Sequence, residues 1–238
     1  MDLKGMAVTP ELLKSFPLLS GLAPESLLDF AEDGTIQKYS RRAIVLAAGE
    51  VTNNLCFLFE GRLQGVDFTI DGREVGLYFV EPGGFCGELA LFDNGTQPEH
   101  VMALTPVVVV MIPFKSIRKA TNRNPEIFSA LGVKLANKVR QMTFQRSLLG
   151  LPNIAQRVCC QLWLLIPARQ KEKMQSGEVA NIPTHMEIAI MLSISRETVT
   201  RVFQNLQNQG IVRRDGGSKL IISDLPSLKA LAEGTSEL

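Results

Sequence analysis

The spacing of apolar residues changes at Pro113, and this change limits the folds that the chain can adopt. Between residues 36 and 112, short apolar runs such as Leu55–Phe59 alternate with glycine-bearing turns, and Val107–Val110 is β-branched enough for a buried strand. Short strands at this spacing predict a small antiparallel roll or barrel. After Pro113 the apolar residues recur at helical spacing instead. We therefore expect an α+β protein of one or two domains.

Smaller signals mark the ends of elements and the expected compartment. Pro10–Phe16 and Pro24–Ala31 predict two short helices, because each places proline near the helix start, where its missing N–H costs nothing. Asp71 and Gly72 predict a hairpin turn. No apolar segment approaches the ~20 residues that span a bilayer, and the first residues lack the apolar core of a signal peptide. We expect a cytoplasmic protein without a membrane segment.

The net charge of +1 conceals an uneven distribution of charged side chains. The first 114 residues carry 7 basic and 15 acidic side chains, whereas the remaining residues carry 18 basic and 9 acidic ones. A basic C-terminal half is suited to a polyanion, and an acidic N-terminal half is repelled from one. If the protein binds nucleic acid, we therefore expect the site in the second half of the chain.

A long amphipathic helix is predicted from Asn124–Glu126 onwards, over about six turns. It packs either on its own roll as a core helix or against a second copy as a dimer seam, and its apolar stripe favours the seam. Gly150–Asn153 interrupts the pattern, because proline disfavours helix in the residue before it. We place the hinge there, with domains at 1–123, 124–150 and 151–238. The stripe consists of six residues: Phe128, Leu131, Leu135, Val139, Met142 and Leu149.

Two capped helices follow in the basic half of the chain. Ile154–Leu165 predicts an apolar helix and Pro167–Asn181 a polar loop. Thr184–Glu187 has the spacing of a capping box, in which the threonine hydroxyl and the glutamate each bind a free N–H at the helix start. The helix pauses at Ser193, and Ser195 is suited to cap the next one. Two short helices joined by a tight turn predict a helix-turn-helix.

The polar face of the second short helix has chemistry suited to the DNA major groove. At 100° per residue, its apolar residues fall on one side and Glu197, Thr200 and Arg201 on the other. Arginine donates a bidentate pair to guanine and glutamate accepts from cytosine, so Arg196, Glu197, Thr200 and Arg201 are candidate base contacts. The alternative is an exposed Glu197–Arg201 ion pair worth only ~0.3–0.5 kcal/mol.

A basic hairpin after this helix argues against the ion-pair alternative. Gln209 and Gly210 end the helix, and residues 211–222 predict a two-stranded wing with cations near its turn. A capped helix, a turn, a second capped helix and a basic hairpin together predict sequence-specific DNA binding. The candidate phosphate contacts are Thr184, Ser195, Thr198, Arg213, Arg214 and Lys219.

These residues resemble the Crp/Fnr family of bacterial transcription regulators, over nearly the whole chain. Ser195–Arg201 is similar to the recognition helix of its cyclic-AMP receptor branch, which reads a TGTGA-type half-site. Phe59–Gly61, Asp71–Glu74 and Gly83–Phe92 resemble the family's effector-binding β-roll, and Asn124–Glu126 the start of its dimerisation helix. The resemblance implies a homodimer on a pseudo-palindromic site, a winged helix-turn-helix, and contact with RNA polymerase.

The chain departs from the family where cyclic nucleotides bind. The resemblance implies an Arg-Ser or Arg-Thr pair for the cyclic phosphate about ten residues after Gly-Glu-Leu, but this stretch has no arginine, and Glu99 adds negative charge. We therefore expect an effector other than cyclic AMP, or a constitutively active protein. Met142 and Thr143 fall where the family contacts adenine. The candidate effector pocket is Gly87, Glu88, Leu89, Gln97, Glu99, His100, Met142 and Thr143.

Several alternatives remain open at this stage. The relined pocket either binds an apolar molecule or a cyclic dinucleotide, or it is closed. His100 would allow a haem to bind, although a surface role fits a single histidine better. The family's N-terminal iron–sulfur cysteines are missing. The sequence shows no activated nucleophile, metal-ligand spacing or phosphate loop, so we do not expect an enzyme; a partner-binding module without DNA recognition is the third alternative. The four cysteines lack CxxC spacing and are expected to be reduced and mostly buried: Cys56, Cys86, Cys159 and Cys160. Redox sensing by Cys56 and Cys86 is the alternative.

Overall fold

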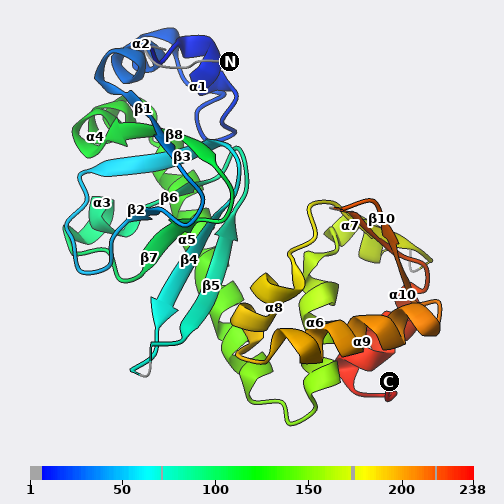
Figure 1. Ribbon diagram of the computed structural model, residues 1–238. Coiled ribbons are helices and arrows are strands. Elements are labelled where there is room, and N and C mark those ends of the chain that lie inside the picture. The colour runs from blue at the N-terminus through cyan, green and yellow to red at the C-terminus, as the bar shows by residue number, and fades with distance from the viewer. Residues whose placement is uncertain (1–6, 71, 173–174, 218) are drawn as a thin grey trace. The chain divides into compact units, whose positions relative to one another are not determined.

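The computed structural model describes residues 7–70, 72–172, 175–217 and 219–238 (Figure 1). Asp71 of the predicted hairpin turn, Ser218 of the predicted wing turn and the first six residues lie outside this description. Two compact units divide the chain: one is formed by the residues up to 73 with 77–139, and the other by 140–238 with 74–76. Among the described residues, no helix is both long enough and apolar enough to cross a membrane.

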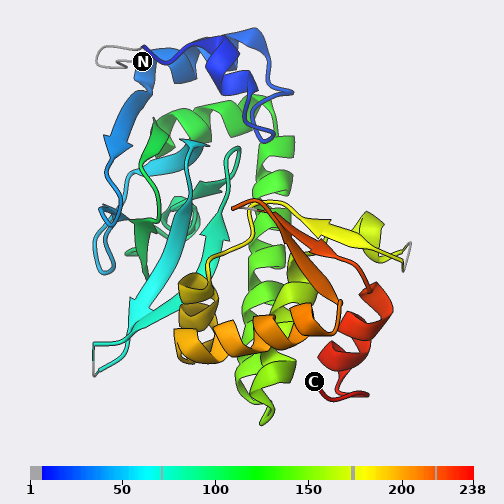
Figure 2. The ribbon, with the colours of Figure 1, turned by 45° about the vertical axis from the view of Figure 1, so that its right-hand side comes forward.

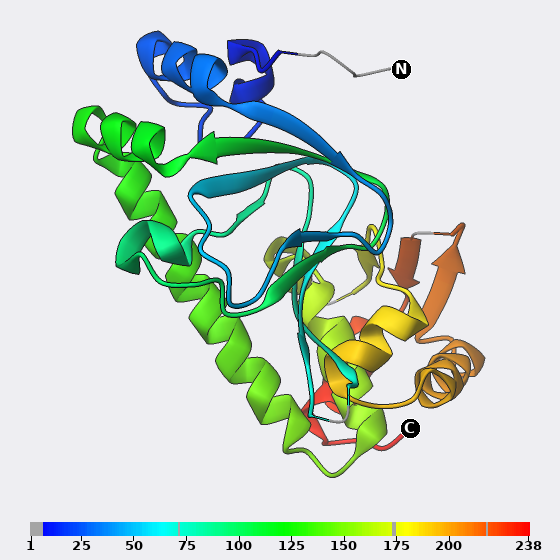
Figure 3. The same cartoon turned by 60° about the vertical axis from the view of Figure 1, so that its left-hand side comes forward.

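The first unit is an antiparallel β-roll of two four-stranded sheets, as the spacing of short strands predicts. The strand orders are β1-β8-β3-β6 and β2-β7-β4-β5. Figure 3 shows β1, β8 and β3 along one side of the roll and β2 with β7 along the other. The strands are β1 Thr35–Tyr39, β2 Ile44–Leu46, β3 Asn54–Glu60, β4 Leu63–Phe68, β5 Glu74–Val80, β6 Phe85–Cys86, β7 His100–Ala103 and β8 Val107–Pro113.

Helices cover one end of this roll and complete its core. The helices are α1 Pro10–Lys14, α2 Pro24–Asp33, α3 Leu89–Asp93, α4 Phe114–Arg123 and α5 Glu126–Leu149. Leu58, Val101 and Val109 belong to a buried cluster inside the roll. Phe16, which follows α1, and helix residues such as Phe30 form a second cluster with strand residues such as Phe57. The predicted pair of short N-terminal helices is confirmed, with each proline at the helix start.

Helix α5 contributes residues to both units, and its burial pattern corrects one expectation. Leu131 has no exposed surface and belongs to the buried cluster of the first unit. It is therefore unavailable to a second subunit, and its assignment to a dimer seam is wrong. Ile127, one turn earlier in α5, belongs to the same buried cluster, so this part of the helix packs on its own unit. The break at Gly150–Asn153 is present between α5 and α6, whereas the two units divide inside α5, after Val139.

The second unit contains the predicted helix-turn-helix and a wing with one more strand than expected. Its elements are α6 Ile154–Leu165, α7 Ala168–Lys171, β9 Gly177–Val179, α8 His185–Leu192, α9 Arg196–Asn208, β10 Val212–Asp215, β11 Lys219–Ile222 and α10 Leu225–Glu233. The sheet order is β10-β11-β9. The predicted polar loop at Pro167–Asn181 is therefore wrong in part, because α7 and β9 lie within it. Elements of three or four residues are too short to show a periodic pattern.

The core of the second unit explains the apolar pattern of its helices. One buried cluster joins Cys159 and Leu162 of α6 to Phe203 of α9 and to Leu228 of α10. All four cysteines are unpaired and buried, as expected. Burial, with a smaller effect of neighbouring Cys160, raises the pKa of Cys159 to about 12, so this thiol stays protonated at neutral pH.

Candidate nucleic-acid interface and effector site

Two caps fix the helix starts of the candidate DNA-binding motif. The Thr184 hydroxyl accepts from the Glu187 N–H at 3.2 Å, and the Glu187 carboxylate accepts from the Thr184 N–H at 2.8 Å, which completes the predicted capping box. The Ser195 hydroxyl accepts from the Thr198 N–H at 3.2 Å and caps α9. Between the helices Ser193 adopts φ 52°, which lies in the left-handed region.

Helix α9 divides its side chains as the helical projection predicts. Val199, Val202, Phe203 and Leu206 are buried and anchor the helix. The side chains of Arg196, Glu197 and Arg201 are exposed on the opposite side. Figure 2 shows α8 at the start of α9 and the wing strands above α9. The anchored side holds the helix in place, and the charged side is left to meet a partner.

The charged side chains on this face have no ion-pair partner within the part of the chain that the structure describes. The exposed Glu197–Arg201 pair, which was the alternative to base recognition, is therefore not formed. The hydroxyl of Thr200 differs, because it donates to the carbonyl of Arg196 at 3.0 Å. It offers a base only its methyl group and an acceptor lone pair.

The cations of the wing are held in different ways. Arg213 and Arg214 are exposed on β10, whereas the Lys219 ammonium lies 2.9 Å from a carboxylate oxygen of Glu178 and 3.7 Å from one of Asp215. Lys219 therefore has carboxylate partners within its own chain and would have to exchange them for a phosphate. The sequence did not reveal this competition, because Glu178 belongs to the unexpected strand β9.

His185 is a residue of this surface that the sequence analysis missed. It occupies the first position of α8, where its Nδ1 lies 2.9 Å from the Thr200 hydroxyl and its Nε2 lies 3.0 Å from an Arg214 nitrogen. Burial lowers the pKa of His185, and the nearby Arg214 and Arg196 guanidiniums lower it further. The only sequence signal was an aromatic, titratable residue directly after the Thr184 cap.

In the first unit, three predicted pocket residues come together in a cluster with a lysine and a tyrosine. The Lys138 ammonium of α5 lies 3.2 Å from a Glu88 oxygen and 3.4 Å from a Glu99 oxygen, and both carboxylates are almost fully buried. The same Glu99 oxygen accepts from the Tyr78 hydroxyl and from the Gln97 amide at 3.2 Å. We call these five residues the roll polar cluster. Lys138 and Tyr78 were not predicted to belong to the site.

The roll polar cluster has an electrostatic character unlike that of a phosphate site. Two carboxylates face a single ammonium, and the Lys138 ammonium also lies 4.0 Å from the centre of the Tyr78 ring. Burial, with smaller effects of Cys86 and Glu99, raises the pKa of Tyr78 well above its ordinary value, so its hydroxyl stays protonated and donates. One oxygen of Glu88 and the carbonyl oxygen of Gln97 are buried without a hydrogen-bond donor. The cluster therefore offers a ligand hydrogen-bond acceptors, whereas its one ammonium is already paired with the two carboxylates.

The remaining predicted pocket residues do not join this cluster. The His100 Nδ1 accepts from the Ala48 N–H at 3.2 Å, and its ring lies against Phe68. Gly87 turns the chain at φ +82°, and a Cβ there would lie 3.0 Å from Leu46, so its role is to allow the turn before Glu88. Met142 and Thr143 belong to the second unit. Among the described residues, no group of three or more histidine, cysteine or acidic side chains could hold a metal ion.

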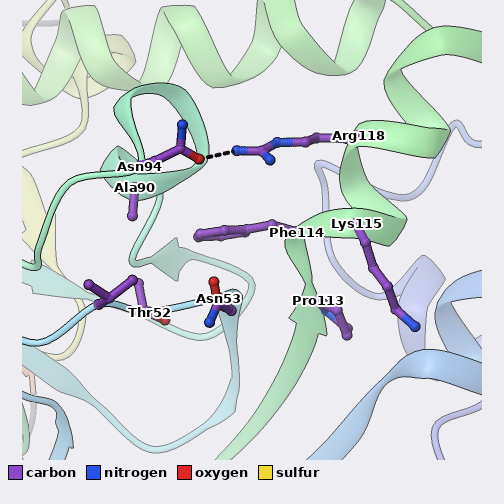
Figure 4. Close-up of a pocket in the computed structure, with 9 residues that line it drawn as sticks. Thr52, Asn53, Ala90, Asn94, Pro113, Phe114, Lys115 and Arg118 are labelled. Carbon is purple, nitrogen blue, oxygen red and sulfur yellow. Dashed lines mark hydrogen bonds between the residues drawn. The ribbon is translucent and has the colours of Figure 1, made fainter.

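A separate cavity of about 360 Å³ opens beside α3 and α4 (Figure 4). Asn94 and Arg118 face each other across a 2.8 Å hydrogen bond at one side, and the Phe114 ring points between Ala90 and Asn53. None of the predicted effector residues lines it. A second cavity of about 240 Å³, which shares Val51–Asn53 with the first, includes Gln97.

Comparisons with known proteins agree with this architecture. Residues 36–124 match the model of the cyclic nucleotide-binding domain, and residues 156–231 match that of the Crp-like helix-turn-helix domain. The chain is 30% identical over 183 residues to the cAMP-activated global transcriptional regulator CRP of Pasteurella multocida, covering 76% of this chain and 87% of the relative. The chain belongs to the Crp/Fnr family. It is a DNA-binding transcription regulator of that family.

Solved structures of other Crp/Fnr proteins share the fold of this regulator. FixK2 from Bradyrhizobium japonicum matches with a TM-score of 0.70 and 21% identity, over 83% of this chain and 96% of FixK2. The c-di-GMP responsive regulator CLP of Xanthomonas campestris matches with a TM-score of 0.63 and 22% identity, over 84% of this chain and 99% of CLP. At these identities the likeness describes the fold, so the specificity of this Crp/Fnr regulator has to be argued from its own residues.

Proposed function

We propose that this Crp/Fnr regulator binds a TGTGA-type palindrome as a homodimer through the exposed face of α9. The observation that carries the proposal is the set of exposed charged side chains without ion-pair partners, namely Arg196, Glu197 and Arg201. Arginine pairs with guanine and glutamate accepts from cytosine, which are bases of this half-site. The wing cations supply phosphate contacts that are independent of sequence. RNA polymerase is the proposed protein partner, by family resemblance, and the cytoplasm the proposed location.

The proposed dimer is formed through the exposed apolar side chains of α5. Phe128, Val139, Met142 and Leu149 are between 38% and 63% exposed, and Leu135 is partly exposed. Phe128, Leu135, Met142 and Leu149 follow one another at intervals of seven residues, the repeat of a helical seam. Val139 lies beside this row, between Leu135 and Met142, and Val139→Glu places a charge there. We expect sedimentation to show a dimer for the unmodified protein and a monomer for this variant.

We further propose that cyclic AMP does not control this regulator. The roll polar cluster supports this, because Glu88 and Glu99 are buried beside a single ammonium and an added phosphate would bring a third negative charge. If Lys138 keeps the roll polar cluster closed to an effector, DNA binding would not depend on one and would be constitutive. A cyclic dinucleotide in a relined pocket remains the second candidate, since the structurally similar CLP is described as responsive to c-di-GMP.

Fluorescence anisotropy with two labelled duplexes tests the proposal. One duplex carries TGTGA and TCACA half-sites separated by about six base pairs, and the other is a scrambled control of equal length. We expect selective binding that is unchanged by cyclic AMP, at fixed salt because phosphate contacts depend on ionic strength. Binding that requires cyclic AMP would contradict the effector proposal, and equal affinity for both duplexes would contradict the proposed operator.

A further inference from the structure

His185 connects the recognition helix to the wing within the second unit. Its ring packs on Phe203 of α9 with centroids 4.5 Å apart, which fixes the plane of the imidazole. From this position one ring nitrogen reaches Thr200 of α9 and the other reaches Arg214 of β10. Arg214 is exposed and is one of the proposed phosphate contacts. The histidine therefore joins three elements that would all meet DNA.

Hydrogen-bond chemistry gives this connection a single direction. A guanidinium only donates, so Arg214 donates to Nε2 of His185. A neutral imidazole then carries its proton on Nδ1 and donates it to the Thr200 hydroxyl, which in turn donates to the Arg196 carbonyl. The series Arg214, His185, Thr200, Arg196 has every donor matched to an acceptor. It requires a neutral histidine in the Nδ1–H form.

The charges around the ring favour this neutral form. The charged groups that face His185 are the Arg196 guanidinium from α9 and the Arg214 guanidinium from β10, and both repel a second positive charge. On its own helix, the Glu187 carboxylate is bonded to the Thr184 N–H at the cap. Protonation of Nε2 would remove the acceptor for Arg214 and place a cation against it.

We propose that His185 is a positioning residue that holds Arg214 of the wing in register with the recognition helix, so that this guanidinium is ordered before it meets a phosphate. Ordering a long side chain in advance removes part of the entropy cost of binding. This inference rests on the proposed function, in which the wing contacts the DNA backbone. Thr200 contributes by fixing the tautomer of the imidazole.

The adjacent residue Arg213 supplies a matched control. It carries the same charge on the same strand and is exposed, and its side chain has no ion-pair or hydrogen-bond partner among the described residues. His185→Phe keeps an aromatic ring on Phe203 but removes both hydrogen bonds. Comparison of Arg214→Met with Arg213→Met then separates the loss of this contact from the loss of a positive charge.

Nitrogen-15 NMR of histidine side chains in the full chain tests the hydrogen-bond series without DNA. The chain has two histidines, and the signal lost in His185→Phe assigns the one of interest. We expect a neutral Nδ1–H tautomer in the unmodified protein. Arg214→Met should raise the pKa of His185 and shift it toward the Nε2–H tautomer, whereas Arg213→Met should leave the tautomer unchanged. An Nε2–H tautomer in the unmodified protein, or the same shift in both variants, would overturn the proposal.

Binding to the labelled duplexes tests the role in DNA contact. We expect His185→Phe to weaken binding about two- to tenfold, the cost of ordering one long side chain, on both duplexes. The same substitution should have no further effect in an Arg214→Met background, but its full effect in an Arg213→Met background. Equal losses in both backgrounds would overturn the positioning role. If the unmodified protein bound neither duplex at low salt, the proposed DNA site would fail, whatever the NMR result.

Discussion

The two units of this regulator differ in the burial and the pairing of their charged side chains. In the β-roll, Glu88 and Glu99 are buried beside the Lys138 ammonium, and Tyr78 and Gln97 of the same chain donate to Glu99, so that one oxygen of Glu88 is left without a donor. In the helix-turn-helix unit, the charged side chains of α9 are exposed and have no ion-pair partner within the described residues. The roll therefore contains a polar site that is largely complete by itself. The other unit presents a polar site that only a partner can complete.

This difference predicts where each unit is sensitive to substitution. A buried ion pair contributes little net stability when intact, but losing one partner leaves an uncompensated buried charge. An exposed charge costs almost nothing to remove from the folded protein, and its value appears only when DNA is bound. Substitutions in the roll should therefore change folding, and substitutions on α9 should change recognition.

The largest expected effect is the loss of the lysine in the roll polar cluster. Lys138→Met leaves Glu88 and Glu99 buried without their cation and should lower the free energy of unfolding by ~3–5 kcal/mol. Urea denaturation followed by circular dichroism measures this change. Lys134→Met is the control, because Lys134 is on the same helix as Lys138, but its ammonium lies over the Phe85 ring of β6 and pairs with no carboxylate among the described residues.

A further variant distinguishes a missing charge from a missing side chain. Adding Glu88→Gln and Glu99→Gln to Lys138→Met removes the unpaired carboxylates and should recover much of the lost stability. A loss of less than about 1 kcal/mol in Lys138→Met would mean that the ammonium is not needed to balance the buried carboxylates.

The next effect concerns recognition by α9. Glu197→Ala should reduce the preference for the TGTGA-type duplex over the scrambled one by ~1–3 kcal/mol, because one base-edge contact is lost. Its unfolding free energy should be unchanged, since Glu197 is exposed and has no ion-pair partner in the described part of the chain. Anisotropy on both duplexes measures the preference. An equal change in affinity for the two duplexes would contradict a base contact.

The turn between the two short helices should gain stability from glycine. Ser193 adopts φ 52°, a conformation that costs an ordinary residue energy and costs glycine little. Ser193→Gly should therefore raise the free energy of unfolding by up to ~1 kcal/mol, with unchanged DNA affinity. Ser223→Gly, outside this turn, is the control for a general effect of glycine. Destabilisation by Ser193→Gly would show that the turn does not strain the serine.

The smallest expected effect is a pH dependence from His185. Its pKa lies below the ordinary value of 6.5 in the folded protein, because of burial and of the Arg214 and Arg196 charges, so the unfolded chain binds more protons below that pH. The unfolding free energy should therefore fall as the pH is lowered from 7.5 to 5.5. Urea titrations at both pH values measure the change. His185→Phe should show a smaller fall, and an identical fall would assign the effect to other groups.

Local patterns in the sequence were sufficient for much of the second unit. The Thr184 capping box and the Ser195 cap depend on neighbours within a few residues, and the structure has both. Strand β9 was missed, because three residues carry no period and its pairing with β11 comes from a distant part of the sequence. Leu131 was misassigned for a related reason, since spacing cannot distinguish a stripe facing a partner from one facing the roll.

The sequence alone determined the alternation of strands and helices, the caps, the charge asymmetry and the absence of an arginine for a cyclic phosphate. These are properties of composition and of residues close in the chain. Only the tertiary structure placed Lys138 between Glu88 and Glu99, and His185 between Thr200 and Arg214. Both arrangements join residues on different elements, and the partner of a buried or titratable group depends on how those elements pack.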